Sequence, residues 1–252
     1  MTAYSKQLFI FDLDGTLVPR TSCMEPEMAQ LFLALLQRKK VAVISGSGYP
    51  KFETQLLRML PGTSEYYGNL LLLPASGTRL YAWRGNWAEQ YAEQLSPAEK
   101  EKITAALTYA MRAAYTAPEK IYGQLIEDRG SQITFSALGP NAPLEQKQLW
   151  DPTRSKREKV ALILREKLSE FDVRIGGTTS IDITRRGVNK GYGIRKLEQF
   201  LKIGPDDILF VGDTLFYGGN DYPVKASGVD CIQVSSPDET KKLIESWLAG
   251  AN

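Results

Sequence analysis

Short apolar runs alternate with amphipathic segments in the first and last thirds of the chain. The runs predict strands, and the segments with apolar residues at helical spacing predict helices. The predicted strands are 8–11, 41–44, 70–73, 208–211 and 231–234, and the predicted helices are 25–37, 51–60, 193–201, a short one closing at 224–227, and 237–248. Strands that alternate with helices are typical of an α/β fold with a parallel sheet covered on both faces.

The middle of the chain follows a different pattern, in which polar and apolar residues alternate along short segments. This alternation indicates an antiparallel sheet with one covered face. The predicted strands here are 124–128, 132–138, 173–175 and 180–184, the predicted helices are 98–115 and 154–171, and 139–143 is a predicted loop. Both outer thirds are needed to complete one parallel sheet, so the middle is predicted to be an inserted α+β domain.

The predicted boundaries follow from this division. The core domain is expected to be discontinuous, covering residues 1–83 and 187–252, and the inserted domain is expected to cover 84–186. We expect Trp83, Trp87 and Tyr91 to pack inside the inserted domain rather than to form an interface.

Composition excludes several classes of site. The chain of 252 residues contains no histidine, which excludes Ser-His-Asp and Cys-His catalysis and every histidine-containing zinc site. A net charge of +2, without a basic stripe interleaved with aromatic residues, does not favour a nucleic-acid partner. Acid–base chemistry must therefore come from Asp, Glu, Lys, Tyr or Cys.

The remaining composition points to a cytoplasmic protein. Cys23 and Cys231 are far apart and form no Cys-x-x-Cys motif, so two free thiols in a reducing compartment are expected. The first residues lack the apolar core of a signal peptide, and no apolar run reaches the length of a membrane span. We therefore expect a cytoplasmic location and no membrane partner.

The run 8–11 ends in two carboxylates, Asp12 and Asp14, followed directly by Gly15. A core does not bury unpaired charge, so the chain is expected to leave the sheet here, at the edge where open α/β sheets bind ligands. On a straight strand Asp12 and Asp14 would point to the same face, and Gly15 permits a tight turn. This arrangement suits a carboxylate nucleophile, a second carboxylate for proton transfer and a divalent cation.

Three further positions lie at the ends of predicted elements. Ser45 closes the strand 41–44 in a glycine-rich turn, Lys190 lies in Gly187–Gly191, and Asp213 closes the strand 208–211 ahead of 218–221. Each alone has an ordinary explanation as a turn former, a flexible loop or a solvated lysine. Their occurrence together predicts phosphoryl transfer.

The predicted roles follow from the charge of a phosphate. Asp12 would become an aspartyl phosphate, and Asp14 would protonate the leaving oxygen and then deprotonate the acceptor. Mg²⁺ held by Asp12 and Asp213 would reduce the repulsion between carboxylate and phosphate, since hard oxygen ligands favour this ion. Lys190 and Ser45 would hold the phosphoryl oxygens.

These four positions resemble the four motifs of the haloacid-dehalogenase superfamily, over nearly the whole chain. The resemblance implies a Rossmann-like core with Asp12 as nucleophile and Asp14 as acid and base. It also implies Mg²⁺ on the Asp12 and Asp213 side chains and the Asp14 carbonyl, with Asp221 supporting the metal. The insert is similar to the superfamily's type IIB (C2B) cap, which confers substrate specificity.

Within the superfamily, segments 126–129, 176–182 and 212–221 are most similar to the eukaryotic-type phosphomannomutases. That family grips the distal phosphate with three cap arginines and the sugar with a Ser and an Asp. The resemblance implies the following substrate contacts: Arg129, Lys147, Ser180 and Asp182 in the cap, with Gly46 and Asn220 beside the core motifs. The second of the three family arginines falls on or near Pro140, and the third falls on Lys147. Arg20 lies one residue out of register with a further arginine of that family.

Two enzymatic functions and one non-enzymatic function remain as hypotheses. A lysine does not replace a bidentate arginine, and segment 182–191 looks more like the IIB sugar phosphatases, so we favour hydrolysis of a small sugar phosphate. The alternative is a phosphomannomutase or phosphoglucomutase, in which Arg154, Arg157, Arg185 or Arg186 compensates for the missing arginines. A sugar-phosphate sensor would not need both Asp12 and Asp14, and a receiver domain fits neither their spacing nor the insert. Family mutases often dimerise through the cap, which leaves a homodimer as an expectation; the sequence does not identify the sugar.

Overall fold

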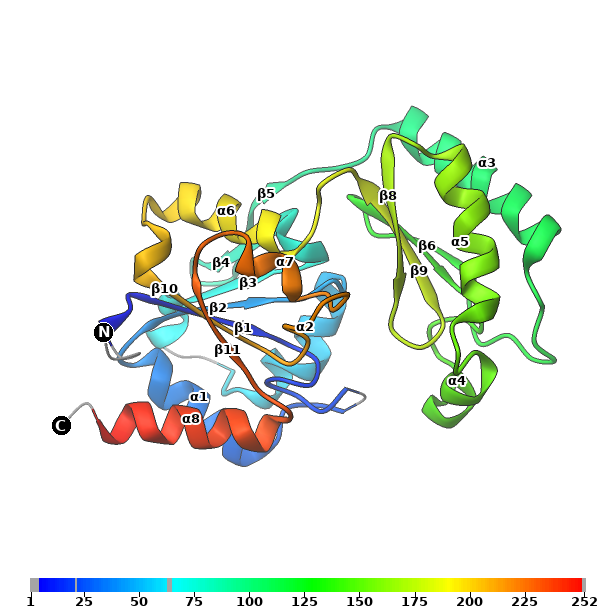
Figure 1. Cartoon of the computed structure of the whole chain (residues 1–252). Coiled ribbons are helices and arrows are strands. Elements are labelled where there is room, and N and C mark those ends of the chain that lie inside the picture. Colours follow the sequence, from blue (N-terminus) through cyan, green and yellow to red (C-terminus); the bar gives the residue numbers. More distant parts are fainter. Residues whose placement is uncertain (1–4, 21, 63–64, 251–252) are drawn as a thin grey trace. The chain divides into compact units, whose positions relative to one another are not determined.

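The chain forms two compact units. The computed structural model describes residues 5–20, 22–62 and 65–250. Its residue contacts separate a core unit, Met1–Ala92 with Asn189–Asn252, from an inserted unit, Glu93–Val188 (Figure 1). The predicted first boundary, at 83/84, falls instead between two paired strands of the core unit, and the second lies close to the observed one.

The core unit is built on a seven-stranded sheet in the order β11-β10-β1-β2-β3-β4-β5. The strands are β1 (Leu8–Asp12), β2 (Lys40–Ile44), β3 (Leu70–Leu73), β4 (Arg79–Trp83), β5 (Trp87–Ala92), β10 (Ile208–Gly212) and β11 (Asp230–Gln233). Neighbouring strands from β11 to β3 are parallel, whereas β4 and β5 extend the sheet in antiparallel fashion. The predicted α/β fold with a largely parallel sheet is confirmed.

Helices cover both faces of this sheet (Figure 1). They are α1 (Pro26–Leu36), α2 (Tyr49–Gln55), α6 (Lys190–Leu201), α7 (Tyr222–Lys225) and α8 (Pro237–Ala249), joined by 3₁₀ segments Leu57–Met59, Glu65–Asn69, Ala75–Gly77 and Pro205–Asp207. Phe9 and Phe11 of β1 pack toward α1 and α8, while Leu8 and Ile10 pack toward α6. Because β1 is buried on both faces, it reads in the sequence as an unbroken apolar run.

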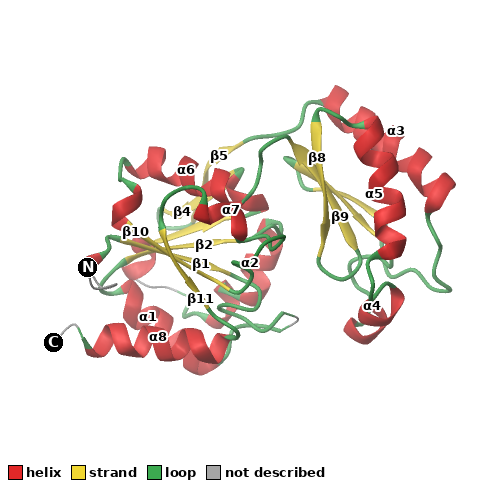
Figure 2. Ribbon diagram, viewed as in Figure 1, coloured by secondary structure: helices red, strands yellow, loops and turns green. Residues whose placement is uncertain are grey.

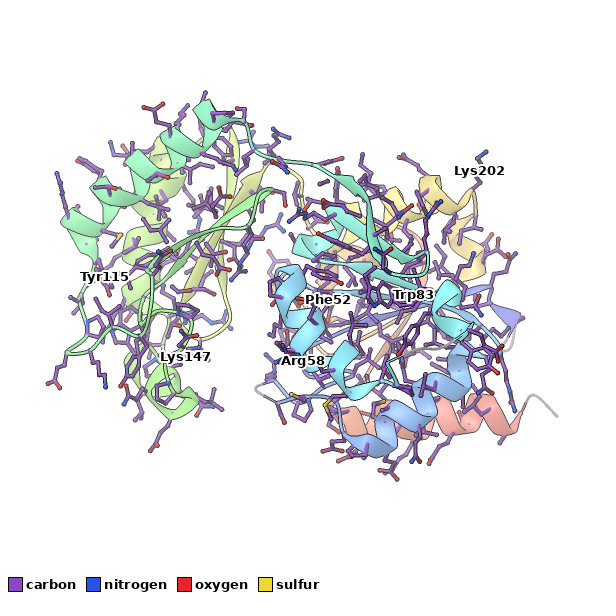
Figure 3. The ribbon with its side chains drawn as sticks, turned by 180° about the vertical axis from the view of Figure 1, so that it is seen from behind. Phe52, Arg58, Trp83, Tyr115, Lys147 and Lys202 are labelled. Carbon is purple, nitrogen blue, oxygen red and sulfur yellow. The ribbon has the colours of Figure 1, made fainter. Side chains whose placement is uncertain are left out.

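The hairpin of β4 and β5 was not predicted, and it changes the place of three aromatic residues. Trp83 and Trp87 lie 5.3 and 5.7 Å, between ring centroids, from Tyr67 of the core unit. Figure 3 labels Trp83 among the strands of the core unit. Tyr91 donates a hydrogen bond of 2.9 Å to the carbonyl of Gly77. The expectation that these residues pack inside the inserted domain is therefore wrong, because their strands complete the core sheet.

The inserted unit is a four-stranded antiparallel sheet in the order β6-β7-β9-β8, with α3 and α5 on one face (Figure 2). Its strands are β6 (Ile126–Asp128), β7 (Gln132–Ser136), β8 (Phe171–Gly176) and β9 (Ser180–Arg185), and its helices are α3 (Pro97–Ala114), α4 (Leu144–Trp150) and α5 (Ser155–Lys167). Phe135 and Ile181 face the helices, whereas Thr134 and its cross-strand partner Asp182 belong to the opposite, polar set. The alternation of the middle segment thus places its polar residues together on one face.

Several helices differ from the predicted ones. The predicted helix 154–171 is too long, because α5 ends at Lys167 and Phe171 already begins β8. The short helix α4 was not predicted. Helix α6 begins at Lys190, which places this residue in the first turn of a helix rather than in the preceding loop.

Two observations bear on the expected setting of the protein. Cys23 and Cys231 are both free, and burial raises the pKa of the Cys231 thiol to about 11. Among residues 5–20, 22–62 and 65–250, none of the helices combines the length and apolar character needed to cross a bilayer.

One buried ion pair holds the inserted unit together. Arg157 Nε lies 2.9 Å from Asp151 Oδ2, and both side chains are almost fully buried. Arg157 Nη1 also donates to the carbonyls of Gly176 and Gly177, each at 3.0 Å, in the turn between β8 and β9. The pair therefore fixes the start of α5 to the turn that leads into Ser180.

We expect Arg157→Met to destabilise the inserted unit by about 3–5 kcal/mol, because it leaves the Asp151 carboxylate buried without a counter-charge. Urea denaturation followed by circular dichroism measures this change. Arg165→Met is the matched control on the same helix, since Arg165 forms an exposed pair with Glu158 whose removal costs about 0–1 kcal/mol. Equal losses for the two variants would contradict a special role for the buried pair.

Candidate active site

The ends of three neighbouring strands bring the core candidates to one edge of the sheet. Asp12 is the last residue of β1, and its register partner in β2 is Ile44, the residue before Ser45. On the other side Phe11 pairs with Val211 of β10, two residues before Asp213. Residues that are far apart in the sequence therefore lie at adjacent carboxyl ends of parallel strands.

Lys190 joins two carboxylates in the interior of this site. Its Nζ donates to Asp12 Oδ1 and, at 2.6 Å, to Asp221 Oδ1. The lysine side chain is 1% exposed, and those of Asp12 and Asp221 are 5% and 0% exposed. The Asn189 side chain accepts the Tyr192 N–H at 3.0 Å, and this cap starts α6 at the position that directs Lys190 into the site.

Burial and neighbouring charge both act on these groups. Burial raises the pKa of Asp12 to about 7, against the opposing effect of Lys190 and with the help of Asp221. Burial disfavours the charge of Lys190, yet the adjoining carboxylates raise its pKa above the ordinary value. One ammonium thus stabilises two buried carboxylates, and the site retains excess negative charge.

Asp213 completes a group of three carboxylates. Asp12, Asp213 and Asp221 each offer an oxygen atom, and these atoms lie within 4.8 Å of one another. Asp213 is also paired with the exposed guanidinium of Arg20, and burial raises the pKa of Asp213 in spite of that partner. An all-oxygen set with unbalanced negative charge is chemically suited to a hard divalent cation.

The two oxygens of Asp221 are already hydrogen-bonded. Oδ1 accepts from Lys190, and Oδ2 accepts from the Thr214 backbone N–H at 3.0 Å and from its hydroxyl at 2.9 Å. Asp221 is therefore well placed to hold Lys190 and the loop after β10.

Gly15 is required by the close approach of the loop after β1 to Asp213. Its φ is +88°, in the left-handed region that favours glycine, and a Cβ atom there would collide with the Asp213 carboxylate. The tight turn predicted at this position serves to bring the backbone against a carboxylate of the site.

Asp14 differs from the arrangement expected for a straight strand. Strand β1 ends at Asp12, so the two-residue spacing no longer places Asp14 on the same strand face. Asp14 Oδ2 lies 2.6 Å from Lys51 Nζ, and Asp14 Oδ1 is a buried acceptor for which residues 5–20, 22–62 and 65–250 supply no hydrogen-bond partner. Asp14 is thus not a member of the group of three carboxylates, although its charge contributes to the raised pKa of Asp12.

The remaining core candidates lie in the turns beside these carboxylates. Ser45 is buried, and its Oγ accepts the Ser47 N–H at 3.1 Å. Gly46 follows it in the same turn. The Asn220 side chain contacts the Thr214 hydroxyl, within the loop that also positions Asp221.

In the inserted unit, Arg129 and Asp182 belong to one polar cluster. Arg129 Nη2 lies 2.8 Å from Glu127 Oε2, while its Nε is buried and has no hydrogen-bond partner in the part of the chain that the structure describes. Asp182 Oδ1 accepts from the Thr134 hydroxyl at 2.8 Å. Burial raises the pKa of Asp182, and the nearby charge of Arg129 opposes that rise.

Ser180 and Lys147 are engaged by the backbone of the inserted unit. The Ser180 hydroxyl donates to the Gly176 carbonyl at 2.8 Å. Lys147 lies on α4 (Figure 3), and its Nζ donates to the Pro140 carbonyl at 2.7 Å. Lys147 thus contacts the position on which the second family arginine falls.

Sequence reasoning did not identify Lys51 and Thr214 as parts of the site. Lys51 lies on a predicted helix, where a lysine usually covers a solvated face, and its pairing with Asp14 depends on the tertiary structure. Thr214 directly follows Asp213, and this position beside a recognised motif was the feature of the sequence that could have identified it as part of the site.

Comparisons of the sequence with known proteins point to one family. The family model described as eukaryotic phosphomannomutase matches residues 28–249. A phosphomannomutase from Spinacia oleracea is 31% identical over 248 residues, covering 96% of each chain. A phosphomannomutase from Schizosaccharomyces pombe is 30% identical over 251 residues, covering 94% of this chain and 92% of its own.

Comparisons of the structure point to the haloacid-dehalogenase fold. An N-terminally truncated IMP-nucleotidase from Plasmodium falciparum has a TM-score of 0.69 at 17% identity, covering 96% of this chain and 70% of its own. Trehalose-6-phosphate phosphatase from Aspergillus fumigatus has a TM-score of 0.58 at 17% identity, covering 97% of this chain and 93% of its own. At these identities the similarity establishes the fold.

The raised pKa of Asp12 leads to a testable pH dependence. Below about pH 7 the Asp12 carboxyl is protonated, and its proton must leave before a cation binds. We therefore expect the cation affinity to fall about tenfold for each pH unit below this value. Calorimetric titration of the metal-free protein with Mg²⁺, between about pH 5 and pH 8, measures this. Asp12→Asn should bind more weakly with a shallower pH dependence, and a pH-independent affinity of the unmodified protein would contradict the assignment.

Proposed function

Because the chain belongs to the eukaryotic phosphomannomutase family, we propose that it is a phosphohexose mutase that moves a phosphoryl group between the 1- and 6-hydroxyls of a hexose. The buried cluster of Asp12, Lys190 and Asp221 supports the phosphoryl-transfer chemistry. The similarity to named phosphomannomutases extends through both units, and it outweighs the preference for hydrolysis that the sequence alone suggested.

Asp12 is the proposed nucleophile. Its oxygen attacks one phosphorus of a hexose 1,6-bisphosphate, the bond from phosphorus to the sugar oxygen breaks, and Asp14 supplies the proton that the leaving oxygen takes, which leaves an aspartyl phosphate and a hexose monophosphate. In the second step Asp14 removes a proton from the acceptor hydroxyl, which attacks phosphorus and frees Asp12. Lys190 lowers the repulsion between Asp12 and the phosphate, and Ser45, whose Oγ already accepts one bond, is proposed to donate its hydroxyl to a phosphoryl oxygen.

Mg²⁺ is the proposed cofactor. The side chains of Asp12 and Asp213 and the backbone carbonyl of Asp14 are the proposed ligands, and Asp221 supports them through its bonds to Lys190 and Thr214. When bound, the ion supplies positive charge that stabilises the phosphoryl oxygens.

The inserted unit is proposed to act as the cap that binds the rest of the substrate. Arg129 carries a buried Nε that no described residue accepts from, which suits a ligand oxygen. Ser180 and Asp182 are the proposed contacts to the sugar, while Gly46 and Asn220 are proposed contacts on the core unit.

Hydrolysis is the second candidate, and one observation favours it. Two of the three family arginines for the distal phosphate are replaced, one at or near Pro140 and the other by Lys147. The Lys147 ammonium is bound to the Pro140 carbonyl. A weaker hold on a bisphosphate intermediate would let it dissociate and would admit water to the aspartyl phosphate.

One assay distinguishes these two functions. The protein is given mannose 1-phosphate or glucose 1-phosphate with Mg²⁺ and a trace of the hexose 1,6-bisphosphate, and hexose 6-phosphate and free phosphate are measured together. A mutase yields hexose 6-phosphate without free phosphate. Release of phosphate in step with loss of substrate would instead establish the hydrolase, and Asp12→Asn should lower either activity by at least roughly a thousandfold.

Arg129 provides a separate test of the proposed cap. We expect Arg129→Met to raise KM for hexose 1-phosphate by roughly 10–100-fold, because a charge-assisted bond to substrate is lost. The KM for p-nitrophenyl phosphate, which lacks a sugar, should stay within about twofold of the unmodified value. Arg174→Met, which removes an exposed cation from the same sheet, is the control; equal effects of Arg129→Met on both substrates would place Arg129 outside the substrate site.

A further inference from the structure

The contact between Lys51 and Asp14 determines how the two oxygens of Asp14 are used. Lys51 Nζ lies 2.6 Å from Asp14 Oδ2, and this ion pair is partly buried, with the two side chains 30% and 23% exposed. Asp14 Oδ1 is a buried acceptor that has no hydrogen-bond partner among the residues described. A buried carboxylate oxygen without a partner is costly, so its persistence next to a paired oxygen calls for an explanation.

We infer that Lys51 is a positioning residue that reserves Asp14 Oδ1 for the proton transferred in the reaction. An ammonium group has donors and no acceptor, so the Asp14 oxygen that it holds cannot carry the proton toward it. When Asp14 is protonated, its proton therefore resides on Oδ1, while Oδ2 accepts from Lys51. When Asp14 is ionised, Lys51 holds the same oxygen and keeps Oδ1 directed to receive a proton.

The fold holds Lys51 where this contact requires it. Helix α2 follows the Ser45 turn, and the Lys51 N–H donates to the Gly48 carbonyl at 3.1 Å. The next residue, Phe52, is fully buried in the core unit (Figure 3). The turn itself is tied to the sheet by bonds from the Ser76 N–H to the Ser45 carbonyl and from the Ala75 N–H to the Ser47 carbonyl, at 2.8 and 2.9 Å.

This inference rests on the proposed function, in which Asp14 is the acid and base. In the first step the phosphorus–oxygen bond to the leaving group breaks as the bond to Asp12 forms, and the Oδ1 proton moves to the leaving oxygen. In the second step Oδ1 takes a proton from the acceptor hydroxyl, whose oxygen bonds to phosphorus as the bond to Asp12 breaks. Lys51 touches neither the phosphate nor the leaving group and acts through Asp14.

The test is the dependence of the first step on the leaving group, because a poor leaving group needs the proton and a good one does not. Release of phenol from phenyl phosphate and of 4-nitrophenol from p-nitrophenyl phosphate is measured in a single turnover, with Mg²⁺ and with the protein in saturating excess over each substrate. We expect Lys51→Met to slow phenol release by at least about tenfold and 4-nitrophenol release by less than about twofold. Lys51→Arg, which keeps a cationic donor, should recover most of the phenol rate.

Controls separate positioning from a general structural role. Arg58→Met removes an exposed cation from the neighbouring 3₁₀ segment and should change neither rate. Equal slowing of both substrates by Lys51→Met, or no slowing, would overturn the inference. Asp14→Asn should show the same selective loss of phenol release. If Asp14→Asn shows this loss and Lys51→Met does not, only the inference on Lys51 is overturned. If Asp14→Asn does not show it, the acid–base role of Asp14 and the inference on Lys51 are both overturned.

Discussion

The balance of charge around Lys190 is the constraint on which the core unit depends. A buried ammonium and two buried carboxylates are each costly alone, and they are tolerated because they contact one another. Keeping them in contact requires β1 to end at Asp12, α6 to begin at Lys190 and the loop after β10 to return Asp221 to the same place. The Asn189 cap, the Gly15 turn and the Thr214 bonds to Asp221 each serve this geometry. The result retains more negative than positive charge, which suits the proposed binding of a divalent cation.

The strands that could be predicted from the sequence are those buried on both faces of the sheet. Strands β1, β2 and β3 are covered on both faces, so their sequences are continuous apolar runs that indicate strands without reference to neighbours. Strands β4 and β5 extend the sheet as an antiparallel hairpin with many half-exposed residues, and their mixed sequences carry no such signal. The same difference explains why the first domain boundary was placed too early.

The candidate site likewise contains residues that could be predicted from the sequence and residues that could not. Asp12, Ser45, Lys190 and Asp213 could be located because each follows or begins a recognisable element and the order of the four is informative. The sequence did not show in which direction the other side chains point. Lys51 pairs with Asp14 because α2 is turned by its buried Phe52, and Lys147 bonds to Pro140 because the unpredicted helix α4 returns it to the preceding loop. Similarity to phosphomannomutases establishes the family, whereas these local contacts bear on how this member holds its substrate.

The discontinuous core has a consequence for the order in which the chain folds. Central strand β1 pairs with β10 through contacts such as Leu8 with Ile208, which are separated by most of the chain. The inserted unit is continuous from Glu93 to Val188 and closes its own sheet over shorter distances. During synthesis the inserted unit is therefore complete before β10 has left the ribosome, while one edge of β1 waits unpaired. Lys190, Asp213 and Asp221, which complete this edge of the sheet, are thus made long after Asp12, so a nascent chain carries the proposed nucleophile well before the residues that surround it exist.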